Sequence, residues 1–125
     1  MKLRYLARSA DGPVLLLADA DPTSARSLQV ALSLLADGHS APVQIHALPC
    51  IQAIDHCQFV AVLTDASIDS SSGECFFWRL KPVQWESVVG LLEPFATASE
   101  PVGHRHQFLG KADRASIIVS TSDHW

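Results

Sequence analysis

The chain has 125 residues, a length that corresponds to a single domain spanning residues 1–125. Hydrophobic residues make up 48% of the chain and charged residues 18%, and this composition excludes a disordered tail. The formal net charge is −4 and the isoelectric point about 5.8, which disfavours direct binding to nucleic acid, because domains that do so usually have an isoelectric point above about 9.

The N-terminal residues predict a β-hairpin. Residues 3–8, in which Tyr5 alternates with Arg4 and Leu6, read as a strand, and residues 14–18 are a continuous apolar run of strand length. Between them, residues 10–13 (ADGP) are typical of a turn. Two short strands joined by such a turn are expected to pair with each other.

A helix is predicted over residues 22–37. Asp21 is suited to cap the free backbone N–H groups, and Pro22 fits the first helical position. Apolar side chains then recur at spacings of three and four, up to Leu35, which places them on one face of a helix. Gly38 is suited to end it.

The middle of the chain predicts three strands and leaves one segment open. Residues 42–48 alternate as a strand does, residues 59–63 are a buried apolar run, and residues 75–80 form a further strand. Residues 51–56 are compatible with either a short helical turn or an edge strand. Residues 65–74 are polar, small and rich in serine, which predicts an exposed loop.

The C-terminal part predicts a second helix and a second hairpin. The helix begins at Pro82 and is expected to end or kink at Pro94, followed by a loop over residues 97–103. Residues 104–109 and 115–120 read as strands joined by a loop of ordinary hairpin length.

These elements predict an α+β domain with the order β-β-α-β-β-β-α-β-β. Hairpins at both ends of the chain favour a mainly antiparallel sheet with two helices packed on it. The regular strand–helix alternation of a doubly wound fold is missing.

The sequence favours a cytoplasmic protein. Lys2 and Arg4 near the N-terminus are not followed by the long apolar run of a secretory signal. The longest apolar runs are far shorter than the roughly 20 residues of a membrane-spanning helix. An odd number of cysteines without a CxxC pair predicts reduced, mostly buried thiols, at Cys50, Cys57 and Cys75.

Histidines are the candidates for catalytic or metal chemistry. On one strand, His104 and His106 would face the same way, as two metal ligands do, but no spacing supplies a third ligand. Together with His46, they are the candidate set for an acid–base hydrolase. Cys57 and His56 point to opposite faces if both are extended, which disfavours a catalytic pair. Structural roles are favoured for all of them.

The sequence also lacks the glycine-rich, nucleophile-elbow and zinc-binding motifs that would identify a cofactor or a reaction. We therefore predict no catalytic, cofactor-binding or metal-binding residues.

The distribution of charge is the most unusual feature of the chain. Residues 27–78 contain no lysine or arginine and supply all of the negative net charge. The acidic residues in this stretch are Asp37, Asp55, Asp65, Asp69 and Glu74. They form either a solvated surface with its countercharges elsewhere, or a face that attracts a basic protein.

The second interpretation predicts a set of contact residues. Asp65, Asp69 and Glu74 lie in or beside the predicted exposed loop, which suits an interface. Trp78 is the predicted aromatic anchor of that contact. The same stretch (CFFWRL) cannot turn all three of its aromatic rings to one side of a strand.

Three segments, FFWRLKPVQWESVVGLLEPF, GHRHQFL and ASIIVSTSDHW, resemble a pattern in small bacterial proteins encoded beside secreted toxins. Residues 75–125 are in this respect similar to immunity proteins of contact-dependent inhibition and other polymorphic toxin systems. The resemblance implies a cytosolic protein that binds one toxin domain and blocks it. Many such toxins are nucleases with basic clefts, which an acidic inhibitor fits. Recognition surfaces in these families are specific to each pair, so no site residues are carried over.

The leading expectation is therefore a non-enzymatic immunity protein that occludes the active site of a cognate toxin. Two alternatives stay open. One is a small hydrolase or metal-dependent enzyme that uses His104 and His106. The other is a general ligand-binding or oligomerisation domain.

Overall fold

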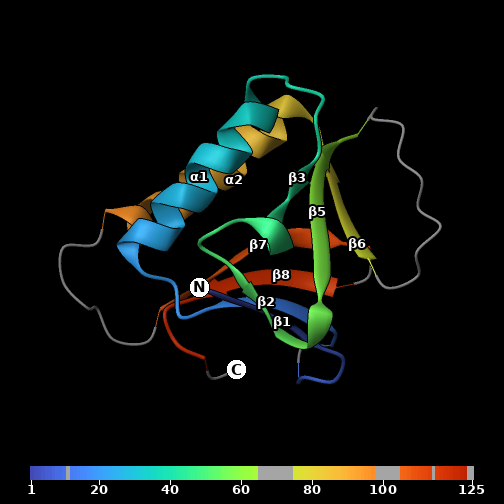
Figure 1. Cartoon of the computed structure of the whole chain (residues 1–125), viewed down its shortest axis with the longest axis vertical. Helices are drawn as coiled ribbons and strands as arrows, with labels where there is room; N and C mark the ends of the chain where they lie inside the picture. Colours follow the sequence, from blue (N-terminus) through green and yellow to red (C-terminus); the bar gives the residue numbers. More distant parts are fainter. Residues whose placement is uncertain (11, 65–74, 98–104, 114, 124–125) are drawn as a thin grey trace.

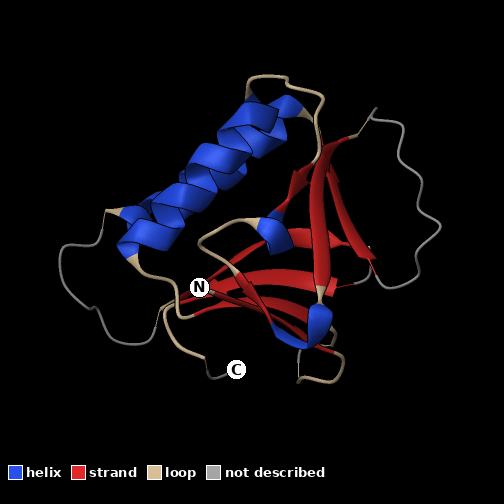
Figure 2. Ribbon diagram, viewed as in Figure 1, coloured by secondary structure: helices blue, strands red, loops and turns tan. Residues whose placement is uncertain are grey.

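The computed structural model describes residues 1–10, 12–64, 75–97, 105–113 and 115–123. They form an α+β structure in which two helices lie side by side and eight strands are divided between two sheets (Figures 1 and 2). The prediction of an α+β fold with two helices is confirmed.

The larger sheet combines both ends of the chain. Its strands stand in the order β4-β1-β2-β8-β7. Their bounds are β1 Lys2–Leu6, β2 Val14–Ala18, β4 Gln52–Ala53, β7 His106–Ala112 and β8 Ala115–Ser120. The two predicted hairpins are confirmed as the antiparallel pairs β1–β2 and β7–β8. The second hairpin is tighter than predicted, because β7 continues to Ala112.

The smaller sheet comes from the middle of the chain. Its order is β3-β5-β6, with β3 at Val43–Gln44, β5 at Gln58–Leu63 and β6 at Cys75–Leu80. Each element of this sheet begins close to where the sequence places a strand. The first is much shorter than the predicted 42–48, because a 3-10 turn, η1 (Ile45–Ala47), follows Gln44 directly.

The prediction of a mainly antiparallel sheet is wrong. Three of the six strand pairs are parallel, namely β1–β4, β2–β8 and β5–β6. The turn sequences at the two ends of the chain predict only that consecutive strands pair with each other. The parallel pairs join strands that are not connected by a tight turn, and no local pattern marks them.

The open segment 51–56 contains both of the structures that its sequence allows. The short edge strand β4 is followed by a second 3-10 turn, η2 (Ile54–His56). Asp55 and His56 have positive φ angles of 53° and 58°. This left-handed conformation is uncommon for residues other than glycine, and it turns the chain sharply into β5.

Helix α1 (Pro22–Ala36) begins as its sequence predicts. The backbone N–H of Ser24 donates to the Asp21 carboxylate at 2.7 Å, while the backbone N–H of Asp21 donates to the Ser24 hydroxyl at 3.1 Å. The hydrogen bond from Ser24 holds the pKa of Asp21 below its usual value. Two of the N–H groups that a helix start leaves free are thereby satisfied.

Helix α2 (Pro82–Ala96) passes through Pro94, where the sequence predicted an end or a kink. It stops at Ala96, within one turn of the proline. Thr97 holds this last turn, because its backbone N–H and its hydroxyl both donate to the Glu93 carbonyl, at 3.0 and 2.9 Å.

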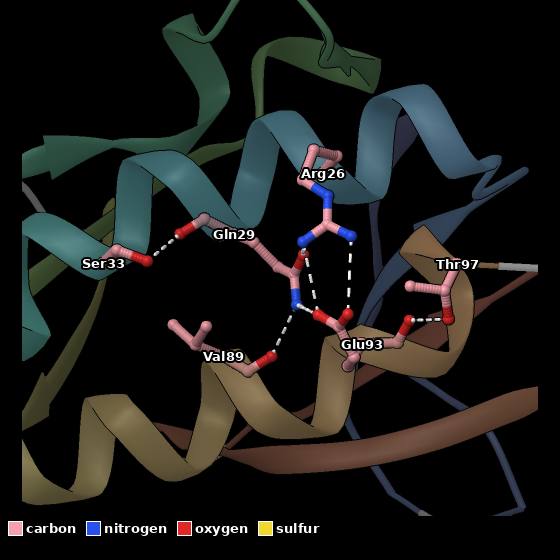
Figure 3. A network of polar contacts seen from close by, with 6 residues as sticks. All are labelled: Arg26, Gln29, Ser33, Val89, Glu93 and Thr97. Carbon is pink, nitrogen blue, oxygen red and sulfur yellow. Dashed lines mark hydrogen bonds and ion pairs between the residues drawn. The ribbon is translucent and has the colours of Figure 1, made fainter.

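The two helices are joined by a polar network on their contact surface (Figure 3). Gln29 of α1 is 3% exposed, and its amide donates to the Val89 carbonyl at 2.8 Å and to the Glu93 carboxylate at 2.7 Å. Arg26 forms an exposed ion pair with Glu93 at 3.3 Å. The bond from Gln29, followed by that from Arg26, lowers the pKa of Glu93. The network therefore sets the register of one helix against the other.

The main core lies between the helices and both sheets. Its largest fully buried side chains include Trp78, Trp85 and Phe59. A second, smaller apolar cluster lies on the opposite face of the larger sheet, and consists of Val14, Leu16, Ala18 and Ile118, with Leu6 packed against it. The larger sheet thus buries apolar side chains on both of its faces.

Candidate functional site

The predicted contact loop is not part of the described structure. Asp65, Asp69 and Glu74 all lie outside the described residues. The two strands that flank the loop are placed, and β5 ends at Leu63 while β6 begins at Cys75. Because β5 and β6 are parallel, these two residues lie at opposite ends of the smaller sheet.

Trp78 belongs to the core and not to the surface. Its side chain is 0% exposed, stacks on Phe59 with ring centroids 5.7 Å apart, and meets the Trp85 ring edge-on at 4.7 Å. A residue buried in this way cannot reach a partner, so the assignment of Trp78 as an aromatic anchor is corrected. The rings of Phe59 and Trp85, which are distant in sequence, bury it in the main core.

Phe77 is the aromatic side chain of β6 that faces away from the core. It is partly exposed, and the Arg79 guanidinium lies 5.3 Å from the centre of its ring. Phe76, in contrast, packs against the core and contacts the ring of Tyr5 at 4.7 Å. This alternation agrees with the prediction that the three aromatic residues cannot share one face.

Two acids of the cation-free stretch are described, and they do not come together. Asp37 is exposed and follows the last residue of α1, whereas Asp55 is exposed in η2. Figure 1 places the end of α1 at the top of the molecule and η2 at the lower end of β5. The stretch therefore does not form one compact acidic patch among the described residues.

What these acids share is their place relative to the smaller sheet. Asp37 precedes β3, Asp55 precedes β5, and the three remaining acids lie between β5 and β6. All five therefore lie in the connections into or between its strands. Of the described residues of this sheet, Arg79 alone is cationic.

The strands of the larger sheet, in contrast, carry three cations. Lys2 and Arg4 lie on β1 and form ion pairs with Asp123 at 3.6 and 3.0 Å, and Lys2 also approaches Asp19 at 3.3 Å. Lys111 lies on β7. Three cations thus lie on strands of this sheet, and two of them, Lys2 and Arg4, are paired with neighbouring carboxylates.

The candidate histidines do not assemble among the described residues. His46 accepts a hydrogen bond from the Phe59 backbone N–H, at 3.0 Å, through its Nδ1 atom. The imidazole thereby replaces the strand partner that β5 lacks where β3 ends, which is a structural role. His106 is exposed on β7, and His104 lies outside the described residues.

The three cysteines are free thiols, as predicted, but the prediction that they are mostly buried is wrong, because Cys50 and Cys75 are partly exposed. Cys57 is buried whereas the neighbouring His56 is exposed, so the two do not form a catalytic pair. Burial, followed by the nearby Cys75, raises the pKa of the Cys57 thiol to about 11. A thiol of this kind is protonated at neutral pH and is a poor nucleophile. Burial also raises the pKa values of Cys50 and Cys75.

No group of three or more histidine, cysteine, aspartate or glutamate side chains within the described ranges is arranged to hold a metal ion. The same ranges contain no helix whose length and apolar character would let it cross a membrane.

Sequence reasoning missed one structural feature of this region. The left-handed pair Asp55–His56 is exposed, and it lies on the turn that leads into β5. Asp tolerates this conformation better than most residues, but no glycine marks the turn, so the sequence has no clear signal for it.

Comparison of the chain with protein-family models, with curated proteins and with solved structures finds no match.

Proposed function

We propose that this protein is a non-enzymatic immunity protein, which binds a cognate secreted toxin and neutralises it by covering the toxin's active site. The observation that carries the proposal is the separation of charge between the two sheets. Five acids and no cation lie between Ser27 and Trp78, and all five lie in connections of the smaller sheet. This distribution of charge fits a toxin with a basic active-site cleft, such as a nuclease.

Charge of one sign speeds the encounter with an oppositely charged surface, because it steers the approach over distances of about a Debye length. The acids that follow β5 are suited to this role, because no lysine or arginine competes for them within the loop. Asp37 supports the same interpretation. It lies at the C-terminal end of α1, where the helix dipole disfavours a carboxylate, so helix stability does not account for its presence.

An interface also needs an apolar centre, and Trp78 is not available for it. Phe77 takes that place in the proposal, because it faces away from the core on the same strand and its ring is partly exposed. Aromatic side chains of this kind often dominate the binding energy of an interface.

The test needs the toxin, which we expect to be encoded immediately upstream as the variable C-terminal domain of a large secreted protein. Co-expression of that domain with this chain should protect cells from it, and the purified chain should bind it without nuclease, protease or modifying activity of its own. A metabolic gene in that position, or a toxin domain that this chain neither binds nor blocks, would rule the proposal out.

The electrostatic part has its own variant and control. Replacing Asp65, Asp69 and Glu74 together by alanine should slow association with the toxin domain about tenfold at low salt and flatten its salt dependence. The matched control replaces Asp11, Glu86 and Glu100, which changes the net charge equally outside the cation-free stretch. Equal effects of the two triple variants would show that net charge, and not the position of the acids, controls association.

A further inference from the structure

The outer side of the helix layer carries apolar side chains where a surface helix usually carries polar or charged ones. Both sheets lie on one side of α1 and α2, and no described helix or strand lies on the other side (Figures 1 and 2). On these helices Val30, Leu34 and Val83 are 62%, 49% and 67% exposed. Together with Leu91 of α2, they are four of the six large apolar side chains that are exposed among the described residues.

The spacing of three of these side chains turns them away from the core. Successive residues of a helix are about 100° apart, so residues two positions apart face nearly opposite ways. Val30 and Leu34 each stand two positions from the buried Leu32 of α1. On α2, Val83 stands two positions before the buried Trp85. All three side chains therefore face outward on the helix layer.

Gly90 lies on the same side, at the middle of α2. It stands two positions before the buried Leu92, and it lies beside Val30 because the neighbouring Gln29 and Val89 are hydrogen-bonded to each other. Glycine destabilises the interior of a helix relative to alanine, yet nothing lies within 4 Å of a Cβ atom added here. Packing within the chain therefore does not require this glycine, whereas the close approach of another helix would.

The helix layer also carries little charge, and part of that charge is balanced. In the 15 residues of each helix, α1 contributes one charged side chain, Arg26, and α2 contributes two, Glu86 and Glu93. Arg26 and Glu93 form an ion pair at 3.3 Å (Figure 3), so Glu86 is the remaining charge of the two helices. When a surface pairs with its own copy, like charges oppose the contact. A surface with so little charge therefore fits a second copy of itself.

We propose that two copies of this chain pair through the outer sides of their helix layers, about a two-fold axis, and form a homodimer with four helices at its centre. Val30, Leu34 and Val83 supply the apolar contact, and Gly90 lets the helices of the two copies approach closely. The interior of an interface is typically poor in charged residues, as this surface is. The pairing involves only this chain, so its test is independent of the proposed binding to a toxin.

The area of the helix layer sets the strength of the dimer. A helix of 15 residues is about 22 Å long, and two packed helices are together about 20 Å wide, so each copy offers roughly 450 Å². Two such surfaces bury about 900 Å² in total, which is less than the roughly 1,200 Å² of the smaller stable interfaces. We therefore expect a weak dimer, with a Kd of about 10–100 μM.

Sedimentation velocity of the purified chain tests the dimer at concentrations from about 2 to about 500 μM. We expect a monomer at the lowest concentration and mostly dimer at the highest. V30K/L34K places lysines of both copies in the contact and should raise the Kd at least about tenfold. The matched control is F108K, because Phe108 is 50% exposed on the face of the larger sheet that points away from the helices, and this variant should pair as the unchanged chain does.

G90L distinguishes close packing of the helices from a general apolar attraction. Leucine favours a helix and meets open space here, so the Tm of dilute protein should not fall. Because the added side chain holds the two copies apart, G90L should weaken the dimer about tenfold. A dimer of equal or greater strength in G90L would overturn the close approach at Gly90.

Three results would overturn the dimer itself. One is a chain that remains a monomer at about 500 μM, well above the expected Kd. Another is a dimer that V30K/L34K leaves unchanged, or that F108K weakens equally. The third is a monomeric chain whose binding to a toxin domain is weakened by V30K/L34K, because the toxin would then be the partner of this surface.

Discussion

The two sheets of this protein differ in where their strands come from and in how their charges are arranged. The larger sheet joins the N-terminal and C-terminal hairpins through the parallel pair β2–β8, and its cations Lys2 and Arg4 are paired with carboxylates. The smaller sheet comes from the middle of the chain, and its connections carry acids with no lysine or arginine between them. The larger sheet therefore pairs charges of opposite sign within the fold, whereas no cation accompanies the acids of residues 27–78 in the sequence.

Side chains of β6 and of the β7 region join the two sheets. Trp78 of β6 stacks on Phe59 of β5 and on Trp85 of α2, and its indole also lies against Gly110 of β7. Asp113, next to the end of β7, accepts a hydrogen bond from the backbone N–H of Phe77 at 3.2 Å. Three substitutions at these contacts measure how much the contacts between the two sheets contribute to stability.

The largest effect is expected from W78A, because it removes the side chain that touches both sheets and a helix. Loss of a fully buried tryptophan should reduce the free energy of unfolding by about 3–5 kcal/mol, measured by urea denaturation followed by circular dichroism. F77A, on the outward face of the same strand, is the control and should cost about 1 kcal/mol or less. Similar losses for the two variants would mean that Trp78 does not join the sheets.

A smaller effect is expected from G110A. A Cβ atom at this position would lie 3.3 Å from Trp78 Nε1, and the φ angle of 149° is one that residues with a side chain rarely adopt. The strain should cost about 1–3 kcal/mol in the same denaturation experiment.

Gly90 is the matched control for that variant. It lies within α2, and nothing stands within 4 Å of a Cβ atom added there. G90A should therefore stabilise the protein by up to about 1 kcal/mol, because alanine favours the helix. If G110A lowered the free energy of unfolding no more than G90A does, the close contact between β6 and β7 would not contribute to stability.

The smallest effect is expected from D113G, which removes the carboxylate that accepts from Phe77. The φ angle of Asp113 is 53°, a conformation that glycine adopts without strain, so the variant adds no backbone strain to the loss of the hydrogen bond. We expect a loss of about 0.5–1 kcal/mol, with faster hydrogen exchange at the Phe77 amide. D113N keeps an acceptor oxygen and should preserve the slow exchange; equal exchange in all three proteins would contradict the bond.

Much of the fold follows from local sequence patterns. The cap at Asp21, the helical spacing after Pro22 and the hairpins at both ends depend on residues that are close in sequence, and all of them are confirmed. Pairing between strands that are distant in sequence does not follow from local patterns. Nothing in residues 14–18 indicates that β2 lies parallel to β8 and not beside another strand, and the prediction of a mainly antiparallel sheet is wrong for this reason.

For the candidate site, too, the sequence determines one part and the packing of the fold another. The absence of cations from residues 27–78 is a property of the sequence, and it remains the basis of the proposed function. Which side chains of that stretch reach the surface is decided by packing, as the neighbours Phe77 and Trp78 show. Either ring is apolar enough to anchor a partner, but only Phe77 faces outward on β6.

By itself, the sequence determined the class of the fold, the starts of both helices, the two hairpins and the position of the acids along the chain. These features depend on periodicity, capping and composition, which act over a few residues. The tertiary structure decided that the strands form two mixed sheets, that Trp78 is core, and that Asp37 and Asp55 lie apart. These outcomes depend on contacts between residues far apart in the chain, where burial of apolar surface outweighs local preference.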